Sequence, residues 1–339
     1  MSRAEKIVLA HGGGGQLTSE LLTEVILPAL GGQNASSLTD AATVPTDGRP
    51  VLFTTDSYVV DPLVFPGGDI GKLSVCGTIN DLAVCGAAPV ALSMALVLEE
   101  GLDVELLRRL MASAGRAATE AGVTIVTGDT KVIERRGEPG MTINTAGVGV
   151  LLAGAKLGFD RVQEGDAVVL SGPLGQHGLA VMCQRKGLSV AASLESDCAS
   201  IHDLTSSLIQ HLGEKLRWMR DPTRGGLAAA LAELSIATGR SIEIRAEAIP
   251  TDPTARAAAE MLGLDLLTIA NEGKLVAVVA DDSAEAAVEI LARHKIAADA
   301  AVIGAVGPLA ELPFVEMITR AGGRRVVQMP YGEELPRIC

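Results

Sequence analysis

Three aspartates stand at positions where an α/β protein often carries its chemistry. Asp56 and Asp129 each follow the expected end of a short apolar strand, and Asp81 lies in an expected helix over residues 70–85. Polar groups just beyond strand ends commonly line α/β active sites. Because Mg²⁺ is usually held by a few carboxylates and nucleotide phosphates, we predict that these three side chains bind it. Any one of them alone is better explained as a capping or turn residue.

Four consecutive glycines form a second candidate element. Gly12, Gly13, Gly14 and Gly15 directly precede an apolar pattern of helical spacing over residues 17–30. Without Cβ atoms, backbone N–H groups can approach an anion closely, and a following helix adds the positive end of its dipole. We therefore predict that this segment binds phosphate. It lacks the Gly-Lys-Ser/Thr of a P-loop, and an N-terminal linker is the alternative.

Two residues suit charge neutralisation and base chemistry. Lys131 stands two residues after Asp129, where a lysine can stabilise charge on bound phosphates, although a solvated surface lysine explains the spacing better. Glu272 follows an apolar run, residues 266–270, that we expect to be a strand. A glutamate there suits base chemistry in a cleft, and a hairpin turn is the alternative.

A further polar segment opens an expected helix that stops at Gly239. Its sequence is Asp221-Pro222-Thr223-Arg224-Gly225-Gly226. It is explained either as a helix start, with Asp221 as N-cap, or as an anion-binding turn to which Arg224 and the glycines contribute. His177, in the glycine-rich turn after an expected strand over residues 167–170, is a candidate ligand contact.

The chain ends in a cysteine, Cys339, which at that position cannot be a core residue. A prenylation motif would place its cysteine four residues from the end. The residues after Pro330 show little hydrophobic periodicity and would reach about 30 Å if extended. We predict a mobile tail that carries a reactive thiol between sites, the alternative being a terminal residue without a role.

Composition narrows the class of protein. The 339 residues include 28 Lys and Arg and 41 Asp and Glu, a net charge of −13, and 2% aromatic residues. Such a chain is a poor nucleic-acid binder. We found no apolar run of the length a membrane-spanning helix needs and no signal-peptide core, so we predict a cytoplasmic protein without membrane contact. Five cysteines without Cys-x-x-Cys spacing indicate reduced thiols and no structural zinc.

The expected elements indicate two α/β domains. Strands at residues 51–55, 123–127 and 142–152 mix with helices at 70–85 and from Asp103 to near Gly122. Residues 154–165 read as a connection to a second domain, in which 301–306 is expected to be the last core strand. The length suits two domains of ordinary size.

Together these segments resemble the HypE family of [NiFe]-hydrogenase maturation factors, within the PurM-like ATP-binding superfamily. The resemblance runs the length of the chain, and the terminal Pro-Arg-Ile-Cys is its most specific part. The matching segments are residues 11–15, Thr54-Thr-Asp-Ser57, residues 65–71, Asn80-Asp81, Gly128-Asp-Thr-Lys131, residues 221–226, Asn271-Glu-Gly273 and Pro336-Arg-Ile-Cys339.

The resemblance implies a PurM-like α/β fold. Its domains would be an ATP-binding and dimerisation domain (1–154), a second PurM-like domain (155–322) and a mobile tail (323–339), with strands of the first domain pairing across a homodimer. ATP and Mg²⁺ would bind near the dimer interface. The implied cofactor-binding residues are Gly12, Gly13, Gly14, Gly15, Asp56, Asn80, Asp81, Asp129, Thr223, Arg224 and Asn271.

The resemblance also implies an activity. A partner, HypF, would carbamoylate Cys339, and the enzyme would use ATP to dehydrate this S-carboxamide to a thiocyanate, with Glu272 as base and Lys131 assisting. The cyanide would pass to iron on a HypC–HypD complex. Two alternatives remain: a PurM-like enzyme such as thiamine-phosphate kinase, acting on a free substrate, and a carrier or scaffold without ATP chemistry.

Overall fold

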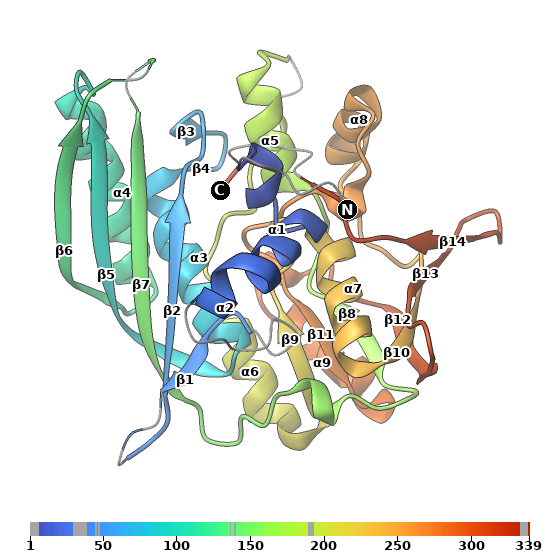
Figure 1. The fold of residues 1–339 in the computed structure, drawn as a ribbon. Coiled ribbons are helices and arrows are strands. Elements are labelled where there is room, and N and C mark those ends of the chain that lie inside the picture. Colours follow the sequence, from blue (N-terminus) through green and yellow to red (C-terminus); the bar gives the residue numbers. More distant parts are fainter. Residues whose placement is uncertain are drawn as a thin grey trace.

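The computed structural model describes residues 7–29, 39–44, 46, 48–135, 137–138, 140–188, 193–332 and 338–339. These residues form two large sheets with helices packed against them and one small hairpin (Figure 1). The first sheet belongs to the N-terminal half of the chain and the second to the C-terminal half. The mixed α/β, two-domain architecture expected from the sequence is confirmed.

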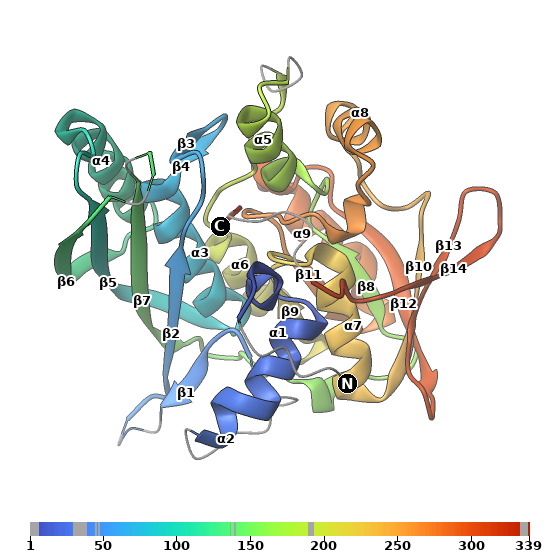
Figure 2. The same ribbon diagram turned by 45° about the horizontal axis from the view of Figure 1, so that its top comes forward.

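The first sheet has the strand order β1-β2-β7-β5-β6 and is antiparallel except for the β5–β6 pair. Its strands are β1 (Ala42–Val44), β2 (Val51–Tyr58), β5 (Ala87–Glu99), β6 (Thr124–Ile133) and β7 (Met141–Leu151). Helices α3 (Ile70–Val84) and α4 (Val104–Glu120) pack on one face (Figures 1 and 2). Along most of β7 every second residue is buried, the pattern of a sheet covered on one side.

Both helices of this domain begin with an aspartate cap. The carboxylate of Asp69 accepts a hydrogen bond from the Lys72 N–H (2.9 Å), and that of Asp103 accepts one from Leu106 (2.8 Å). These bonds satisfy N–H groups that the first helical turn leaves without partners. The predicted cap at Asp103 and the helix predicted over residues 70–85 are confirmed, the latter ending at Val84.

The second sheet is covered on both faces. Its order is β14-β13-β10-β12-β8-β11-β9. Its strands are β8 (Ala167–Leu170), β9 (Leu216–Arg220), β10 (Arg240–Arg245), β11 (Val276–Val279), β12 (Ala301–Leu309), β13 (Val315–Ile318) and β14 (Arg324–Val327). In β8, Val168 and Leu170 join one apolar cluster, while Ala167 and Val169 join another. Alternate residues therefore serve two cores, which explains why this strand is apolar throughout.

Helices lie on both sides of this sheet. Helix α7 (Gly226–Thr238) packs on one side, and α6 (His202–Leu212) and α9 (Ala284–Ala292) pack on the other. Helices α5 (Gln176–Arg185) and α8 (Pro253–Leu262) instead pack in the core cluster that contains the helices of the first domain. Two predictions here were wrong. Residues 266–270 form no strand, because Asp265 caps a short 3₁₀ turn at Leu266–Thr268. Residues 301–306 are not the last core strand, because β13 and β14 continue the sheet.

Described segments near both ends of the chain pack against its C-terminal half. The N-terminal segment forms α1 (Gln16–Leu21), a π-helical turn (Leu22–Ile26) and α2 (Leu27–Ala29), which confirms the helical pattern there. Helix α1 lies next to α7, and the C-terminus lies between the two sheets near α5 (Figures 1 and 2). The last two residues, Ile338 and Cys339, are therefore packed against the rest of the protein.

Candidate active site

A pocket forms where the two halves of the chain meet. It is built by β2, α3, the loop before α7, the loop after the 3₁₀ turn at 266–268, and the last residue. Its lining consists of Asp56, Ser57, Tyr58, Gly77, Asp81, Asp221, Thr223, Arg224, Glu272 and Cys339. The fold thus gathers the predicted site residues Asp56, Asp81, Thr223, Arg224, Glu272 and Cys339 around one cavity.

A cluster of carboxylates lies at one side of this pocket. Asp40, Asp81 and Asp221 each offer an oxygen within 4.8 Å of the others. The Thr54 hydroxyl donates to Asp81 (2.7 Å), and Arg220 pairs with Asp40 (3.1 Å). One oxygen of Asp221, Oδ2, is buried and has no hydrogen-bond partner within the described part of the chain.

Burial favours the protonated forms of Asp81 and Asp221 in this cluster. Burial raises the pKa of Asp81 well above its usual value, and repulsion from Asp56 and Asp221 adds to the effect. Burial, with repulsion from Asp40, raises the pKa of Asp221 to about 8. A divalent cation would neutralise the cluster and give Asp221 Oδ2 a partner. The residues present therefore fit Mg²⁺, with Asp40 and Asp221 beside the predicted ligand Asp81.

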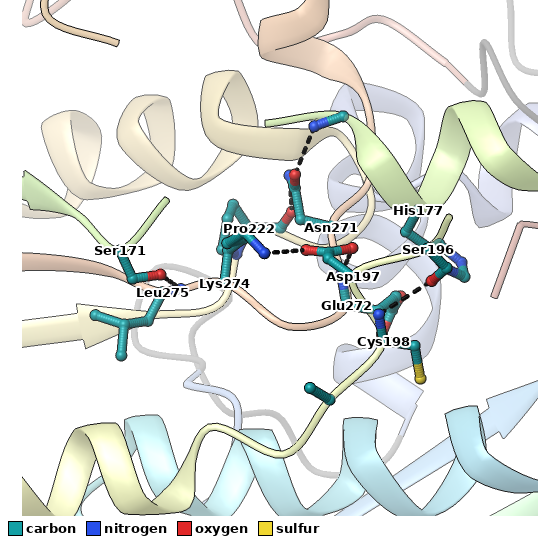
Figure 3. Close-up of polar contacts among 12 residues, drawn as sticks. Ser171, His177, Ser196, Asp197, Cys198, Pro222, Asn271, Glu272, Lys274 and Leu275 are labelled. Carbon is teal, nitrogen blue, oxygen red and sulfur yellow. Dashed lines mark hydrogen bonds and ion pairs between the residues drawn. The ribbon is translucent and has the colours of Figure 1, made fainter. Parts of the chain in front are cut away.

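Glu272 is almost completely buried beside this cluster. Burial raises the pKa of Glu272 well above its usual value, and Asp221 and Asp197 raise it further by repulsion. The backbone N–H of Glu272 donates to Asp197 Oδ1 (3.2 Å), and Asp197 Oδ2 pairs with Lys274 Nζ (3.2 Å) (Figure 3). Both members of that ion pair are buried, so it fixes the loop that carries Glu272.

Two predicted cofactor-binding asparagines have their amides occupied by the protein itself. Asn271 accepts from the Gly175 N–H (2.7 Å) and donates to the carbonyl of Pro222 (2.9 Å) (Figure 3). It also donates to the carbonyl of Ile269 (3.0 Å). Asn80 accepts from the Ile201 N–H (2.9 Å). Its amide group donates to backbone carbonyl oxygens of residues 199 and 272. In this structure both side chains join loops, and neither lines the pocket.

In a single copy of the chain, the side chains of Asp129 and Lys131 do not line this pocket. They lie inside β6, where their side chains are 63% and 70% exposed and pair with each other (3.3 Å). The prediction that the strand ends at Thr127 was wrong. Gly128 signals a turn in sequence, but here a Cβ at that position would lie 2.0 Å from the Met94 carbonyl oxygen of β5. The glycine therefore permits close strand pairing.

The glycine run leads into α1, whose first N–H groups already have partners. Gln16 and Leu17 donate to the carbonyls of Pro330 (3.0 Å) and Tyr331 (3.1 Å). A Cβ on Gly15 would lie 2.1 Å from the Pro330 oxygen. In this structure these groups hold the base of the tail. Phosphate binding by Gly12, Gly13, Gly14 and Gly15 stays a prediction.

The tip of the tail is part of the pocket wall. Ile338 is buried in the core cluster between α3, α4 and α5, and Cys339 packs against it. The negative charge of Cys339 is the main cause that raises the pKa of Arg224, which also lines the pocket. The residues before this tip, 333–337, lie outside the described part of the chain, and β14 occupies residues 324–327 of the predicted tail.

Sequence reasoning missed several residues around the site. Asp40 gave no signal, since an aspartate before a short strand is commonplace, and Asp221 was recognised only as part of an anion-binding turn or a helix start. It is not the N-cap of α7, because Gly225 occupies that position. Asp197 and Lys274 sit far apart in sequence, so only the fold pairs them.

Comparison with known proteins agrees with this geometry. Residues 38–151 match the model of the AIR synthase related protein N-terminal domain, and residues 163–312 match that of its C-terminal domain. The fold and the site therefore define a protein of the AIR synthase related class.

Relatives narrow the class further. The carbamoyl dehydratase HypE of Rhizobium leguminosarum bv. viciae is 45% identical over 98% of this chain and 95% of that protein. A crystal structure of HypE with ATP is 42% identical, with a TM-score of 0.82 over 98% of this chain and 100% of that one. A HypE–HypF complex gives 43% identity and a TM-score of 0.85 over 91% and 99%. This chain belongs to the carbamoyl dehydratase HypE family.

Proposed function

We propose that the chain is an ATP-dependent dehydratase that converts an S-carboxamide on Cys339 into a thiocyanate. The cyanide group would then supply ligands for the iron of a [NiFe]-hydrogenase. The observation that carries this proposal is the position of Cys339, which lines the same pocket as Glu272 and the acidic residues Asp81 and Asp221. A substrate attached to the chain meets these groups without a separate binding step.

Dehydration of a carboxamide needs a better leaving group than hydroxide. Transfer of the γ-phosphoryl group of ATP to the carboxamide oxygen forms an O–P bond while the bond between the γ-phosphorus and its bridging oxygen breaks and ADP leaves. The C–O bond of the phosphorylated carboxamide then breaks and releases that oxygen as phosphate. The nitrogen loses its two protons, and its electron pairs complete the C≡N bond. Mg²⁺ would neutralise phosphate charge, with Asp40, Asp81 and Asp221 as its ligands and Asp56 nearby.

Glu272 is the residue we propose as the base. Its raised pKa makes its ionised form a stronger base than an ordinary glutamate. A cation at the neighbouring carboxylates would remove the repulsion from Asp221 and lower the pKa of Glu272 again. Burial, the larger cause of the raised pKa of Glu272, would remain.

A homodimer would explain where Asp129 and Lys131 act. Strand β6 is the edge of its sheet, and nearly all of its residues are exposed, including Val126 at 63% and Val132 at 69%. A long exposed edge strand is normally covered by another chain. We propose that a second copy pairs here through its first domain and that Asp129 and Lys131 complete the site of the partner.

Further partners follow from the proposed chemistry. HypF would supply the carbamoyl group, as the HypE–HypF complex suggests, and a HypC–HypD complex would accept cyanide. None of the helices in the described ranges has the length and apolar character needed to cross a bilayer. The net charge of −13 argues against nucleic acid as a partner, and we propose a cytoplasmic location because the proposed partners are hydrogenase maturation factors.

The residue ranges of the two family matches and the two sheets support two domains with a boundary between residues 151 and 163. We propose domains at 1–154 and 155–322, the second continued by β14 (Arg324–Val327), with the mobile part of the tail after that strand.

Mass spectrometry of the C-terminal peptide tests the proposed reaction. The full chain is carbamoylated by HypF or cyanate and then given MgATP. We expect the Cys339 peptide to gain a carbamoyl group and to lose one water only with ATP. An unchanged carbamoylated peptide while ATP is hydrolysed would instead favour a kinase acting on a free substrate, whose activity would survive deletion of the tail.

A further inference from the structure

The tip of the tail is held by two hydrogen bonds to backbone oxygens. The Val59 N–H, just after β2, donates to a main-chain carboxylate oxygen of Cys339 (3.1 Å). The ring nitrogen Nε2 of His177 on α5 lies 3.0 Å from the Ile338 carbonyl oxygen. The two contacts come from different halves of the chain, so they fix the last peptide between them.

The hydrogen bonds around His177 define which ring nitrogen carries the proton. The Cys198 N–H donates to Ser196 Oγ (3.0 Å), and Ser196 Oγ lies 2.8 Å from His177 Nδ1 (Figure 3). Because the Ile338 carbonyl can only accept, Nε2 must carry a hydrogen. In the neutral ring Nδ1 is then an acceptor, and the Ser196 hydroxyl donates to it.

Burial keeps the His177 ring neutral and fixed in place. The ring is fully buried, and this burial lowers its pKa. The edge of the ring meets Phe65 in a T-shaped contact with centroids 5.3 Å apart. The ring therefore has one orientation, and its Nε2–H points at the tail.

We propose that His177 is a positioning residue that latches the tail, holding the Ile338 carbonyl so that Cys339 stays in the pocket. The contact of the N-terminal segment with Pro330 and Tyr331 anchors the base of the tail, so opening of the latch frees Ile338 and Cys339 while Pro330 and Tyr331 stay in place. The inference rests on the proposed function, since Cys339 is the substrate carrier there.

Alkylation of Cys339 by a maleimide, followed by mass spectrometry of the C-terminal peptide, tests the latch without ATP or a carbamoyl group. His177→Phe keeps a ring but has no donor. Loss of one neutral hydrogen bond predicts an alkylation rate raised about two- to twelvefold. His177→Gln, which restores an N–H donor, should return it toward the wild-type rate. His211→Phe, on the exposed side of α6, is the control for the substitution itself.

An unchanged rate in a folded His177→Phe protein, judged by its melting temperature, would overturn the proposal, as would an equal increase in His211→Phe. Should His177→Phe not fold, Ser196→Ala removes the hydroxyl that fixes the ring and should also raise the rate. An unchanged rate in that variant would overturn the latch as well. Since this assay involves no chemistry on the carboxamide, a failed dehydratase assay leaves its outcome unaffected.

Discussion

The acidic cluster predicts an unusual dependence of stability on pH. Asp221 has a pKa of about 8 in the folded chain, against an ordinary value of 3.8. Between these values the folded protein keeps a proton that the unfolded chain has released. The contribution of Asp221 is thus fully present below the unfolded pKa and is lost as pH rises toward 8. One such group changes the free energy of unfolding by roughly 1 kcal/mol per pH unit.

Asp221→Asn isolates this contribution, because an amide has no proton to lose. In metal-free buffer we expect the free energy of unfolding of the variant to fall less steeply between pH 5 and 8, by roughly 1 kcal/mol per pH unit. Urea denaturation of the full chain at several pH values measures it. Asp299→Asn, an exposed position, is the matched control and should keep the wild-type slope.

Mg²⁺ should reverse the trend in the wild type. Since metal ligands must be deprotonated, the stabilisation by Mg²⁺ should grow with pH and should be largely lost in Asp221→Asn. Equal slopes for wild type and variant without metal, or equal stabilisation by Mg²⁺, would refute the idea that Asp221 is a buried, protonated ligand.

Three further predictions test other parts of the site. Lys274→Met leaves a buried carboxylate unpaired and should lower the free energy of unfolding by about 3–5 kcal/mol; a loss below about 1 kcal/mol in urea denaturation would contradict a buried pair. Lys131→Ala and Glu272→Gln should each abolish water loss from carbamoylated protein. When the two variants are mixed and their dimers re-equilibrate, one site of each mixed dimer has both residues, so roughly a quarter of wild-type activity should return. No recovery would argue against a site shared between two copies. In Gly15→Ala the new Cβ would push the Pro330 carbonyl away from the start of α1, so limited proteolysis should cut the tail faster than in the wild type. Gly12→Ala is the control, because a Cβ there meets no other atom. Equal cleavage of the two variants would contradict the contact that anchors the base of the tail.

Elements with a strong local pattern could be predicted from the sequence. The strand over residues 167–170 and the helix capped by Asp103 lie where apolar spacing and capping residues indicated them. Strand β5, Ala87–Glu99, was missed, because nothing local separates its long apolar run from a helix. The predicted strand ended before Gly128, whereas β6 continues through it. The sequence could not show this, because glycine is required there by the close approach of the neighbouring strand β5.

Some of the site residues could also be predicted from the sequence, and others could not. Motifs singled out by residue type, such as those holding Asp81, Glu272 and Cys339, lie around one pocket. Asp40 and the ion pair of Asp197 with Lys274 could not be found, because their importance depends on burial and on partners distant in sequence. Only the folded structure identifies these residues as part of the site.

The fate of the carboxamide oxygen tests the central claim most directly. Cys339 would be carbamoylated with a group that carries heavy oxygen, and the phosphate released with MgATP would be analysed by mass spectrometry. If ATP activates the carboxamide as proposed, the heavy oxygen appears in phosphate as Cys339 becomes the thiocyanate. Unlabelled phosphate, with the heavy oxygen in water or still on Cys339, would contradict phosphorylation of the tethered substrate.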